Sequence, residues 1–469
     1  MTAQQDGRAA SDVTVSALVS ELRAGFDSGL TRPVAWRLDQ LSRLAALLTE
    51  HEDDIAAALA SDLGKPAAEA YLNETGFLLA EVGLARRWLR WWLRPRPIKP
   101  ALATVPAVAW TVREPRGVCL VIAPWNYPLE LSLSPLIGAL AGGNAAVLKP
   151  SELAPATAAL LAELLPAYLD RRAVRVVLGG VPETTALLRE RFDHIFYTGN
   201  GRVARIVAAA AAQHLTPVTL ELGGKSPVFV DGTTDLRVAA DRIAWGKWNN
   251  AGQTCVAPDH ILATPHAADQ LERLLPEAAR RMFGEDPQRS PHYGRIVNEA
   301  HHARLVSYLG DGRVVSGGRH EAADRYLEPT VLADIRPGAA VMQEEVFGPI
   351  LPIVRVPDAG AAIDTINAGE KPLALYVFSS DAATRRRFIE GTSSGALTFG
   401  LPVAHVAIPD LPFGGVGASG MGAYHGEHSL TTFTHTKPVV LTPDRPHFLA
   451  LAHPPIPEAR LRFLKRLLR

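Results

Sequence analysis

Short apolar segments alternate with helical stretches between Gly117 and Leu222, and this alternation is the feature that most restricts the fold. The apolar segments expected to form strands are Val118–Ile122, Ala145–Leu148, Val174–Leu178, Ile195–Tyr197 and Val218–Leu222. Helical character is found in Glu152–Leu165, with Ser151 as its N-cap, and in Arg202–His214. Strands that are apolar along almost their whole length are typical of a parallel sheet covered by helices on both faces. The sequence therefore predicts an α/β fold with a Rossmann-type parallel sheet.

The chain is long enough for more than one domain, because 469 residues exceed what a single hydrophobic core normally organises. Residues 12–93 carry leucines at spacings of three and four, which predicts helices that end before a proline-rich segment. A second alternating block, residues 226–399, has expected strands at Pro227–Val230, His260–Ala263, Ile350–Val356, Leu373–Phe378 and Ala396–Phe399. We expect a second α/β domain there, and a further strand at Val439–Leu441.

Charge and composition exclude several classes of protein. Lys plus Arg and Asp plus Glu are 48 each, so no net field attracts nucleic acid. Two cysteines cannot form a disulfide framework, which favours a reducing cytoplasmic location. The N-terminus is polar, unlike a signal peptide, and no apolar run approaches the length of a membrane span. We expect a cytoplasmic protein without a nucleic-acid partner or an integral membrane segment.

Two basic segments leave alternatives open. In residues 86–94 arginines lie between tryptophans, as in some nucleic-acid sites, but the balanced charge favours an amphipathic helix with packed tryptophans. The C-terminal segment Glu458–Arg469 is a basic amphipathic helix by pattern. It could make peripheral contact with an anionic membrane, or dock on the protein or on a partner subunit. Its short length and single aromatic residue favour docking.

Cys255 is a candidate nucleophile because it follows the small, polar segment Asn249–Thr254. The backbone of such a segment can approach a substrate closely. The alternative is that the thiol is a small buried hydrophobe, as Cys119 within Val118–Ile122 is expected to be. A free thiol has a pKa of roughly 8.5, so catalysis at neutral pH needs a local field or a base.

Glycines and an acidic residue suggest nucleotide binding. The segment Gly199–Ala204 satisfies the pattern G-x-G-x-x-G/A between a predicted strand and a predicted helix, where backbone N–H groups can bind phosphate. Glu221 follows about 20 residues later, where a dinucleotide-binding fold places its ribose ligand. A carboxylate at the end of a strand equally faces the crevice in which catalysis takes place. The residues alone leave both roles for Glu221 open.

Several motifs, in order, resemble signature sequences of the aldehyde dehydrogenase superfamily. These motifs are Pro124–Pro128, Leu148–Glu152, Glu221–Lys225, Gly252–Cys255, Glu344–Pro349 and Pro412–Gly417. Their order and spacing agree over residues 15–435, and Asn250–Asp259 and Ser419–Gly426 resemble the class 3 branch. The resemblance implies an aldehyde dehydrogenase-like fold with a cofactor domain, a catalytic domain and a small oligomerisation β-extension. It also implies oxidation of medium-chain or long-chain aliphatic, or aromatic, aldehydes.

The resemblance implies specific roles for three residues. Cys255 is expected to attack the aldehyde carbon and form a thiohemiacetal. The Asn126 side-chain amide and the Cys255 backbone N–H are expected to bind the oxyanion. After hydride transfer to a nicotinamide cofactor, Glu221 is expected to activate the water that hydrolyses the thioester. The resemblance thus assigns Glu221 to catalysis.

The expected cofactor contacts come from the same resemblance. They are Lys149 and Glu152 at the adenosine ribose, Gly199 at the phosphate-binding helix, Glu345 at the nicotinamide ribose, Phe347 beside it, and Trp125. The Glu152 carboxylate would repel a 2′-phosphate, which favours NAD, with NADP possible. Lys225 is interpreted as structural. No metal site is expected, because His405, His425 and His428 lack metal-ligand spacing.

Three departures from the family pattern could affect the site. Asn200 stands where many members have Ser, and Ala204 where Gly is frequent, so we expect altered pyrophosphate contacts. Gly400-Leu401 replaces an Asn-Asp pair of the class 3 branch, which predicts a roomier or more apolar aldehyde pocket.

The expected organisation follows the resemblance. Residues 1–94 and 119–221 form the NAD(P)-binding domain, 222–410 the catalytic domain, 95–118 and 411–445 the oligomerisation segments, and 446–469 a tail. Ala107–Arg113 is expected to pair across a homodimer interface. Two alternative functions are a CoA-acylating dehydrogenase, which generally lacks the general-base Glu, and a non-catalytic binding protein on the same scaffold. The presence of Cys255, Glu221 and Asn126 argues against both.

Overall fold

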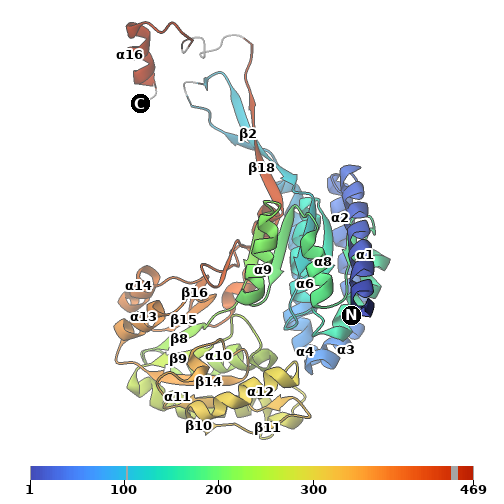
Figure 1. Cartoon of the computed structure of the whole chain (residues 1–469). Coiled ribbons are helices and arrows are strands. Elements are labelled where there is room, and N and C mark those ends of the chain that lie inside the picture. Colours follow the sequence, from blue (N-terminus) through green and yellow to red (C-terminus); the bar gives the residue numbers. More distant parts are fainter. Residues whose placement is uncertain (1, 102–103, 445–450, 452, 468–469) are drawn as a thin grey trace.

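The computed structural model describes residues 2–101, 104–444, 451 and 453–467, and the side chains of residues 2–13 and 467 are not considered. Of the expected tail 446–469, residues 446–450, 452, 468 and 469 lie outside the described residues. Figure 1 shows two sheet-and-helix bodies, and an extended arm that leaves the body containing the first half of the chain. The helix α16 (Glu458–Leu467) lies beyond the tip of that arm.

The first body is built on a six-stranded sheet with the order β17-β7-β6-β3-β4-β5. Its parallel strands are β3 (Val118–Ile122), β4 (Ala145–Lys149), β5 (Val174–Val176), β6 (His194–Thr198) and β7 (Val218–Glu221). Only β17 (Gly420–Met421) is antiparallel; it pairs with β7. The carboxyl ends of the parallel strands therefore share one edge, which is where ligands bind in such sheets.

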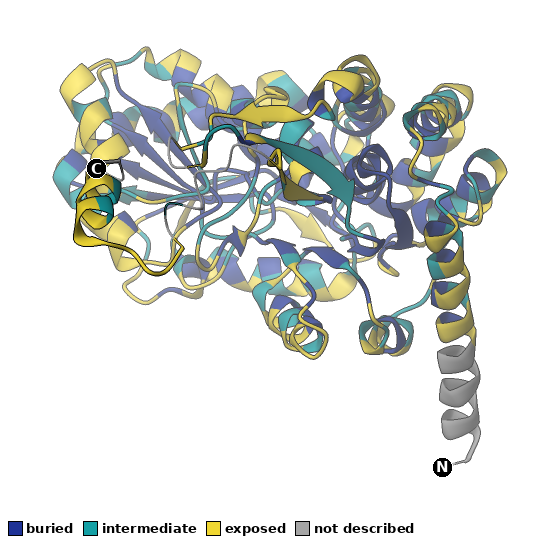
Figure 2. Ribbon diagram, turned by 90° about the horizontal axis from the view of Figure 1, so that it is seen from above, coloured by how far each residue is buried: buried dark blue, intermediate teal, exposed yellow. Residues whose placement is uncertain are grey.

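Alternate residues of these strands supply two separate cores, because successive side chains point to opposite faces. Cys119, Val121 and Phe196 pack against α2 (Val34–Glu50), α5 (Gly76–Trp92), α6 (Glu130–Gly142) and α7 (Pro155–Tyr168). Val118, Leu120 and Ile195 pack against α1 (Thr2–Asp27), α8 (Val181–Arg189) and α9 (Gly201–Ala212). Figure 2 shows the buried strands enclosed by helices whose outer surfaces are exposed.

The second body contains a seven-stranded sheet with the order β10-β13-β14-β9-β8-β15-β16. Its strands are β8 (Pro227–Val230), β9 (His260–Ala263), β10 (Arg313–Ser316), β13 (Thr330–Ala333), β14 (Ile350–Arg355), β15 (Ala374–Phe378) and β16 (Ala396–Phe399), of which β10 alone is antiparallel. Its helices are α10 (Leu236–Trp248), α11 (Pro265–Phe283), α12 (Glu299–Ser307), α13 (Ala359–Ala368) and α14 (Ala382–Gly391). A short hairpin joins β11 (His320–Glu321) and β12 (Tyr326–Leu327).

The arm is an antiparallel sheet of β1 (Arg96–Ile98), β2 (Val108–Pro115) and β18 (Thr434–Leu441). The remaining helices are α3 (Glu52–Leu63) and α4 (Ala67–Ala70), which precede α5, and α15 (Gly426–Thr432), which leads into β18. In the part of the chain that the structure describes, no helix has the length and apolar character needed to cross a membrane.

The predicted parallel sheets and N-terminal helices are present, but several element boundaries differ by one to five residues. The helix expected at Glu152–Leu165 is α7, which begins at Pro155 because proline suits the first helical position. The Ser151 hydroxyl accepts a hydrogen bond from the Leu153 N–H and makes a turn, so the prediction of Ser151 as an N-cap was wrong. Strand β5 ends at Val176, and β18 begins five residues before the expected Val439.

Candidate active site

A single cavity of about 570 Å³ lies at the carboxyl ends of the six-stranded sheet and reaches toward the second body. All predicted catalytic and cofactor-binding residues line it, namely Trp125, Asn126, Lys149, Glu152, Gly199, Glu221, Cys255, Glu345 and Phe347. These residues are distributed over more than 200 positions of the sequence. The fold therefore brings the whole predicted set into one space.

Cys255 follows a tight turn that ends α10. The turn Asn249–Gly252 has left-handed backbone at Asn250 (φ 52°), Ala251 (φ 51°) and Gly252 (φ 76°). A Cβ atom at Gly252 would lie 2.2 Å from the carbonyl oxygen of Gly348, so glycine is required there both for conformation and for space. The packed turn fixes the direction in which the chain enters Cys255.

The Cys255 thiol is partly buried and faces the cavity, whereas Cys119 is fully buried in the core, as predicted. Burial raises the pKa of the Cys255 thiol, and the nearby carboxyl groups of Glu345, Glu130 and Glu221 raise it further. Its own backbone N–H acts in the opposite direction. The resting side chain is therefore a neutral thiol, and a nucleophilic role requires transfer of its proton to a base.

Glu221 ends β7 and is buried between its register partners Thr198 on β6 and Gly420 on β17. Neither carboxylate oxygen has a hydrogen-bond partner among the described residues. Burial raises the pKa of Glu221 well above its ordinary value. Such a carboxyl group can hold a proton near neutral pH and exchange it with a molecule in the cavity.

Asn126 lies in the loop between β3 and α6 and is buried. Its side-chain Nδ2 donates to the carbonyl oxygen of Gln253 at 3.0 Å. Its own carbonyl oxygen accepts from Asn250 Nδ2 at 2.8 Å. A primary amide carries two N–H groups, so one remains for an acceptor in the cavity.

The opposite end of the cavity has donors suited to a dinucleotide. Lys149, at the end of β4, donates to the carbonyl oxygen of Pro150 at 2.8 Å and to Glu152 at 3.4 Å. Burial lowers the pKa of Lys149, and Glu152, half-exposed at the rim, opposes that shift. Gly199 and the start of α9 line the same wall, where free N–H groups of a helix bind phosphate. These groups suit the ribose hydroxyls and phosphates of NAD(P).

Sequence comparison decides the family. The model of the aldehyde dehydrogenase family matches residues 4–439. The chain belongs to the aldehyde dehydrogenase family.

Similar proteins place this aldehyde dehydrogenase in the class 3 branch, as predicted. It is 49% identical over 448 residues to aldehyde dehydrogenase family 3 member A2 of Mus musculus, covering 95% of this chain and 93% of that protein. It is 47% identical to the dimeric NADP-preferring aldehyde dehydrogenase of Canis lupus familiaris, covering 92% of this chain and 95% of that protein. A solved structure of Staphylococcus aureus AldH in its substrate-bound state has a TM-score of 0.94 at 41% identity, covering 97% and 99% of the two chains. The predictions of the fold and of an NAD(P)-dependent enzyme that oxidises aldehydes are confirmed.

The residues at which this aldehyde dehydrogenase departs from the family pattern differ in how they relate to the cavity. Asn200 is the N-cap of α9, since its side chain accepts from the Val203 N–H at 3.0 Å. Ala204 packs in the core beneath the sheet and is absent from the cavity lining, so the expected effect of its methyl group on pyrophosphate contacts is not supported. Gly400 has left-handed backbone (φ 77°), and its carbonyl oxygen accepts from Arg242 at 2.7 Å, also outside this cavity lining.

The loop before β14 carries Glu345 and Phe347 into the cavity. Burial raises the pKa of Glu345 to about 8, with Asp259 as the next cause. Lys225 forms an ion pair with Asp259 and donates to the carbonyl oxygens of Val341 and Glu344, each at 2.8 Å. Lys225 therefore holds this loop, in agreement with its structural interpretation.

Sequence reasoning missed His301 on α12. Its ring lies 5.2 Å from that of Trp125, which in turn lies 5.4 Å from Phe347, and all three line the cavity. Burial lowers the pKa of His301, so the ring is neutral. No motif surrounds it, and only the fold brings it to the site. Within the described residues, no group of His, Cys, Asp and Glu side chains is arranged to hold a metal ion.

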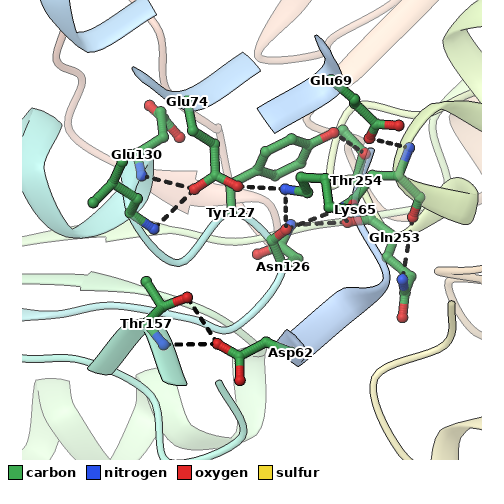
Figure 3. A network of polar contacts seen from close by, with 12 residues as sticks. Asp62, Lys65, Glu69, Glu74, Asn126, Tyr127, Glu130, Thr157, Gln253 and Thr254 are labelled. Atoms are coloured by element: carbon green, nitrogen blue, oxygen red, sulfur yellow. Dashed lines mark hydrogen bonds and ion pairs between the residues drawn. The ribbon is translucent and has the colours of Figure 1, made fainter. Parts of the chain in front are cut away.

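Sequence reasoning also missed a buried network behind Asn126, shown in Figure 3. Lys65, between α3 and α4, forms a fully buried ion pair with Glu74 and donates to the carbonyl oxygen of Asn126 at 3.3 Å. Its ammonium group lies 4.2 Å from the centre of the Tyr127 ring. The Tyr127 hydroxyl is 2.7 Å from that of Thr254, next to Cys255. The network connects the N-terminal helices to the Asn126–Tyr127 loop and to Thr254, next to Cys255.

Proposed function

We propose that this enzyme oxidises apolar aldehydes, either medium- or long-chain aliphatic or aromatic, to carboxylic acids, with Cys255 as nucleophile and Glu221 as general base. The observation that carries the proposal is the convergence of Cys255, Glu221 and Asn126 in one cavity with the dinucleotide-type contacts. The class 3 relatives support an aldehyde as the substrate, and the resemblance to that branch implies the apolar class.

The first step forms a bond between the Cys255 sulfur and the aldehyde carbon. The thiol proton must leave, and Glu221 is the carboxyl group in the same cavity that can accept it when ionised. Negative charge develops on the carbonyl oxygen. The remaining Asn126 N–H and the Cys255 backbone N–H stabilise that charge.

The chemistry that a bound NAD(P)⁺ supplies is acceptance of hydride from that carbon, which leaves a thioester on Cys255. Lys149, Glu152 and the start of α9 would hold the adenosine ribose and phosphates, and Glu345 the nicotinamide ribose. Trp125 and Phe347 supply an apolar wall beside it. Glu221 releases the first proton to solvent and then takes a proton from the water that attacks the thioester. It returns this proton to the departing Cys255 sulfur, so that the free thiol and the carboxylic acid are the products.

The cofactor preference that we propose is NAD. The Glu152 carboxylate, linked to Lys149, opposes a 2′-phosphate by charge repulsion. The relative from Canis lupus familiaris is named NADP-preferring, so NADP is the competing possibility. Comparison of kcat/KM for both cofactors tests the preference. Glu152→Gln should improve the use of NADP relative to NAD, and a native preference for NADP would refute the proposal.

We further propose a cytoplasmic homodimer. The arm exposes Val108, Val440 and Leu441 on its strands, which supports a contact with a second subunit. The two cysteines, both free, suit a reducing compartment. Sedimentation equilibrium tests the dimer, and Val440→Asp should shift the protein toward monomer. A monomeric native protein would contradict the proposal.

The central experiment is a panel of aliphatic and aromatic aldehydes assayed with NAD and NADP for cofactor reduction. The native protein should be most active with apolar aldehydes, and Cys255→Ala should abolish activity while the protein stays folded. Cys119→Ala is the matched control, because it removes the other thiol from the core and should leave kcat unchanged. Activity that requires added CoA would support the acylating alternative, and inactivity throughout the panel would support the binding-protein alternative.

A further inference from the structure

Glu69 on α4 contacts the turn that precedes the nucleophile. One carboxylate oxygen accepts the backbone N–H of Asn250 at 2.7 Å. With the Asn249 amide turned to the orientation that satisfies both of its polar atoms, its nitrogen donates to both Glu69 oxygens at 3.2 Å and its oxygen accepts from Asn73 at 2.8 Å. The N-terminal helical region therefore binds the turn at two consecutive residues, and Figure 3 shows Glu69 in the same network of polar contacts as Gln253 and Thr254.

The turn needs this restraint because its backbone is strained. Asn250 and Ala251 both have left-handed backbone, which is unfavourable for a residue with a Cβ atom because that atom crowds the following carbonyl oxygen. Asn can partly compensate through its side chain, but Ala cannot. Such conformations persist only where the surrounding contacts determine them.

A shift of Asn250 would reach both sides of the reacting centre. Its side-chain amide donates to the carbonyl oxygens of Asn126, at 2.8 Å, and of Gln253, at 3.2 Å. The Asn126 amide donates to the same Gln253 oxygen at 3.0 Å. Asn250 therefore makes hydrogen bonds both to Asn126, the proposed oxyanion donor, and to the segment that leads to Cys255.

We propose that Glu69 is a positioning residue for aldehyde oxidation, which through Asn249 and Asn250 holds the Asn126 amide and Cys255 in a common orientation. The inference rests on the proposed roles of Asn126 and Cys255. Glu69 does not line the cavity and so does not act on the substrate or the cofactor itself.

The surroundings of Glu69 make its ionisation sensitive to pH. Burial raises the pKa of Glu69 to about 7, Lys65 and the Asn250 N–H oppose that shift, and Glu74 adds to it. The Tyr127 and Tyr293 side chains also lie close enough to Glu69 to interact electrostatically with its carboxylate. An ionised carboxylate binds N–H groups more strongly than a neutral acid. The turn should therefore loosen as the pH falls through the pKa of Glu69.

The test compares Glu69→Ala, Glu69→Gln and, as control, Glu285→Gln, which changes an exposed loop carboxylate. Glu69→Ala should lower kcat by about 10- to 100-fold, as expected for a misplaced reacting group, with KM for NAD unchanged. Glu69→Gln keeps an acceptor for Asn250, so it should restore most of kcat at neutral pH. It should also remove the change in kcat centred at about pH 7, because glutamine does not titrate.

A second measurement follows Cys255 without turnover. Alkylation by iodoacetamide, located by mass spectrometry, reports on Cys255, because Cys119 is fully buried. The pH dependence of this alkylation near pH 7 should differ between native protein and Glu69→Gln, and Glu285→Gln should match native protein. Native-like kcat and alkylation in Glu69→Ala would overturn the inference while leaving the proposed function intact. An inactive native enzyme would instead overturn the proposed function, and the inference with it.

Discussion

The side-chain amide of Asn126 donates a hydrogen bond to the carbonyl oxygen of Gln253 at 3.0 Å, two residues before Cys255. Asn126 follows a strand of the six-stranded sheet, whereas Gln253 belongs to the body built on the other sheet. The bond joins the proposed oxyanion donor to the nucleophile loop across the boundary between the two sheets. The relative position of donor and nucleophile therefore depends on how the two bodies meet.

Asn126→Ala should lower kcat far more than a loss of stability alone would explain. Loss of one oxyanion donor should lower kcat by about 100- to 1000-fold. Loss of the bond to Gln253 should cost only about 0.5–1.5 kcal/mol in unfolding free energy, because the Gln253 carbonyl oxygen keeps its bond from Asn250. Asn367→Ala is the control. It removes a side-chain amide that donates to the carbonyl oxygen of Gly391 at an exposed position of α13, and it should leave kcat unchanged. A comparable loss of kcat in both variants would contradict the role of Asn126.

Glu221→Gln should inactivate the enzyme and stabilise it. Removal of the general base should slow both the deprotonation of Cys255 and the hydrolysis of the thioester, so steady-state cofactor reduction should fall by about 100- to 10,000-fold. Because the folded pKa of Glu221 is raised, ionisation costs stability as the pH rises from the unfolded value of about 4.3 through the folded pKa. The urea midpoint of Glu221→Gln should therefore exceed that of native enzyme at neutral and alkaline pH, but not at acidic pH.

Glu81→Gln is the matched control for Glu221→Gln. Both oxygens of Glu81 are also buried, and burial raises its pKa to about 7 against the opposing effect of the Ser134 hydroxyl. Glu81 lies outside the cavity lining, so this variant should share the gain in stability and keep its activity. If Glu221→Gln keeps full turnover, the general base must be another group.

Motifs located the candidate cavity because its residues stand in short segments with a fixed order. Glu221 could be placed at the end of a predicted strand and Cys255 in a small-residue loop, whereas Glu345 was placed only by the resemblance. The position of Glu221 follows from the shared edge of the parallel strands, but its approach to Cys255 depends on how the two bodies meet. The contribution of Glu69 could not be predicted, because it depends on a strained turn whose backbone angles leave no mark in the sequence.

Two errors have local physical causes. Ser151 is a good N-cap by type, but Pro155 fixes the first helical turn three residues later than expected. The early part of β18 is exposed and polar, so it carries no apolar period. It is a strand because β2 pairs with it from Thr434 to Leu441, a long-range contact that no local pattern records.

Lys65→Met should be strongly destabilising, because it leaves the Glu74 carboxylate buried without its ion pair. We expect a loss of about 3–5 kcal/mol in unfolding free energy, measured by urea denaturation. The double variant Lys65→Met/Glu74→Gln should recover part of that loss, since no unpaired charge remains. Arg43→Met, which breaks an exposed pair with Asp39, should cost no more than about 0.5 kcal/mol. Equal losses in the buried and exposed cases would show that Lys65 contributes little through its charge.

Gly252→Ala should disturb the nucleophile through space as well as conformation. Gly252 (φ 76°) and Gly338 (φ 71°) both have left-handed backbone, so alanine should cost roughly 1–2 kcal/mol of strain at either position. At Gly338 nothing lies within 4 Å of the added Cβ, whereas at Gly252 the Gly348 carbonyl oxygen is 2.2 Å away. Unfolding and kcat measurements on both variants should therefore show a larger loss of stability for Gly252→Ala. Its kcat should also fall, because the turn must move and carries Cys255 with it, while Gly338→Ala stays fully active. If both alanine variants lose the same stability and keep native kcat, the backbone around Gly252 and Gly348 must adjust to the added methyl group without moving Cys255.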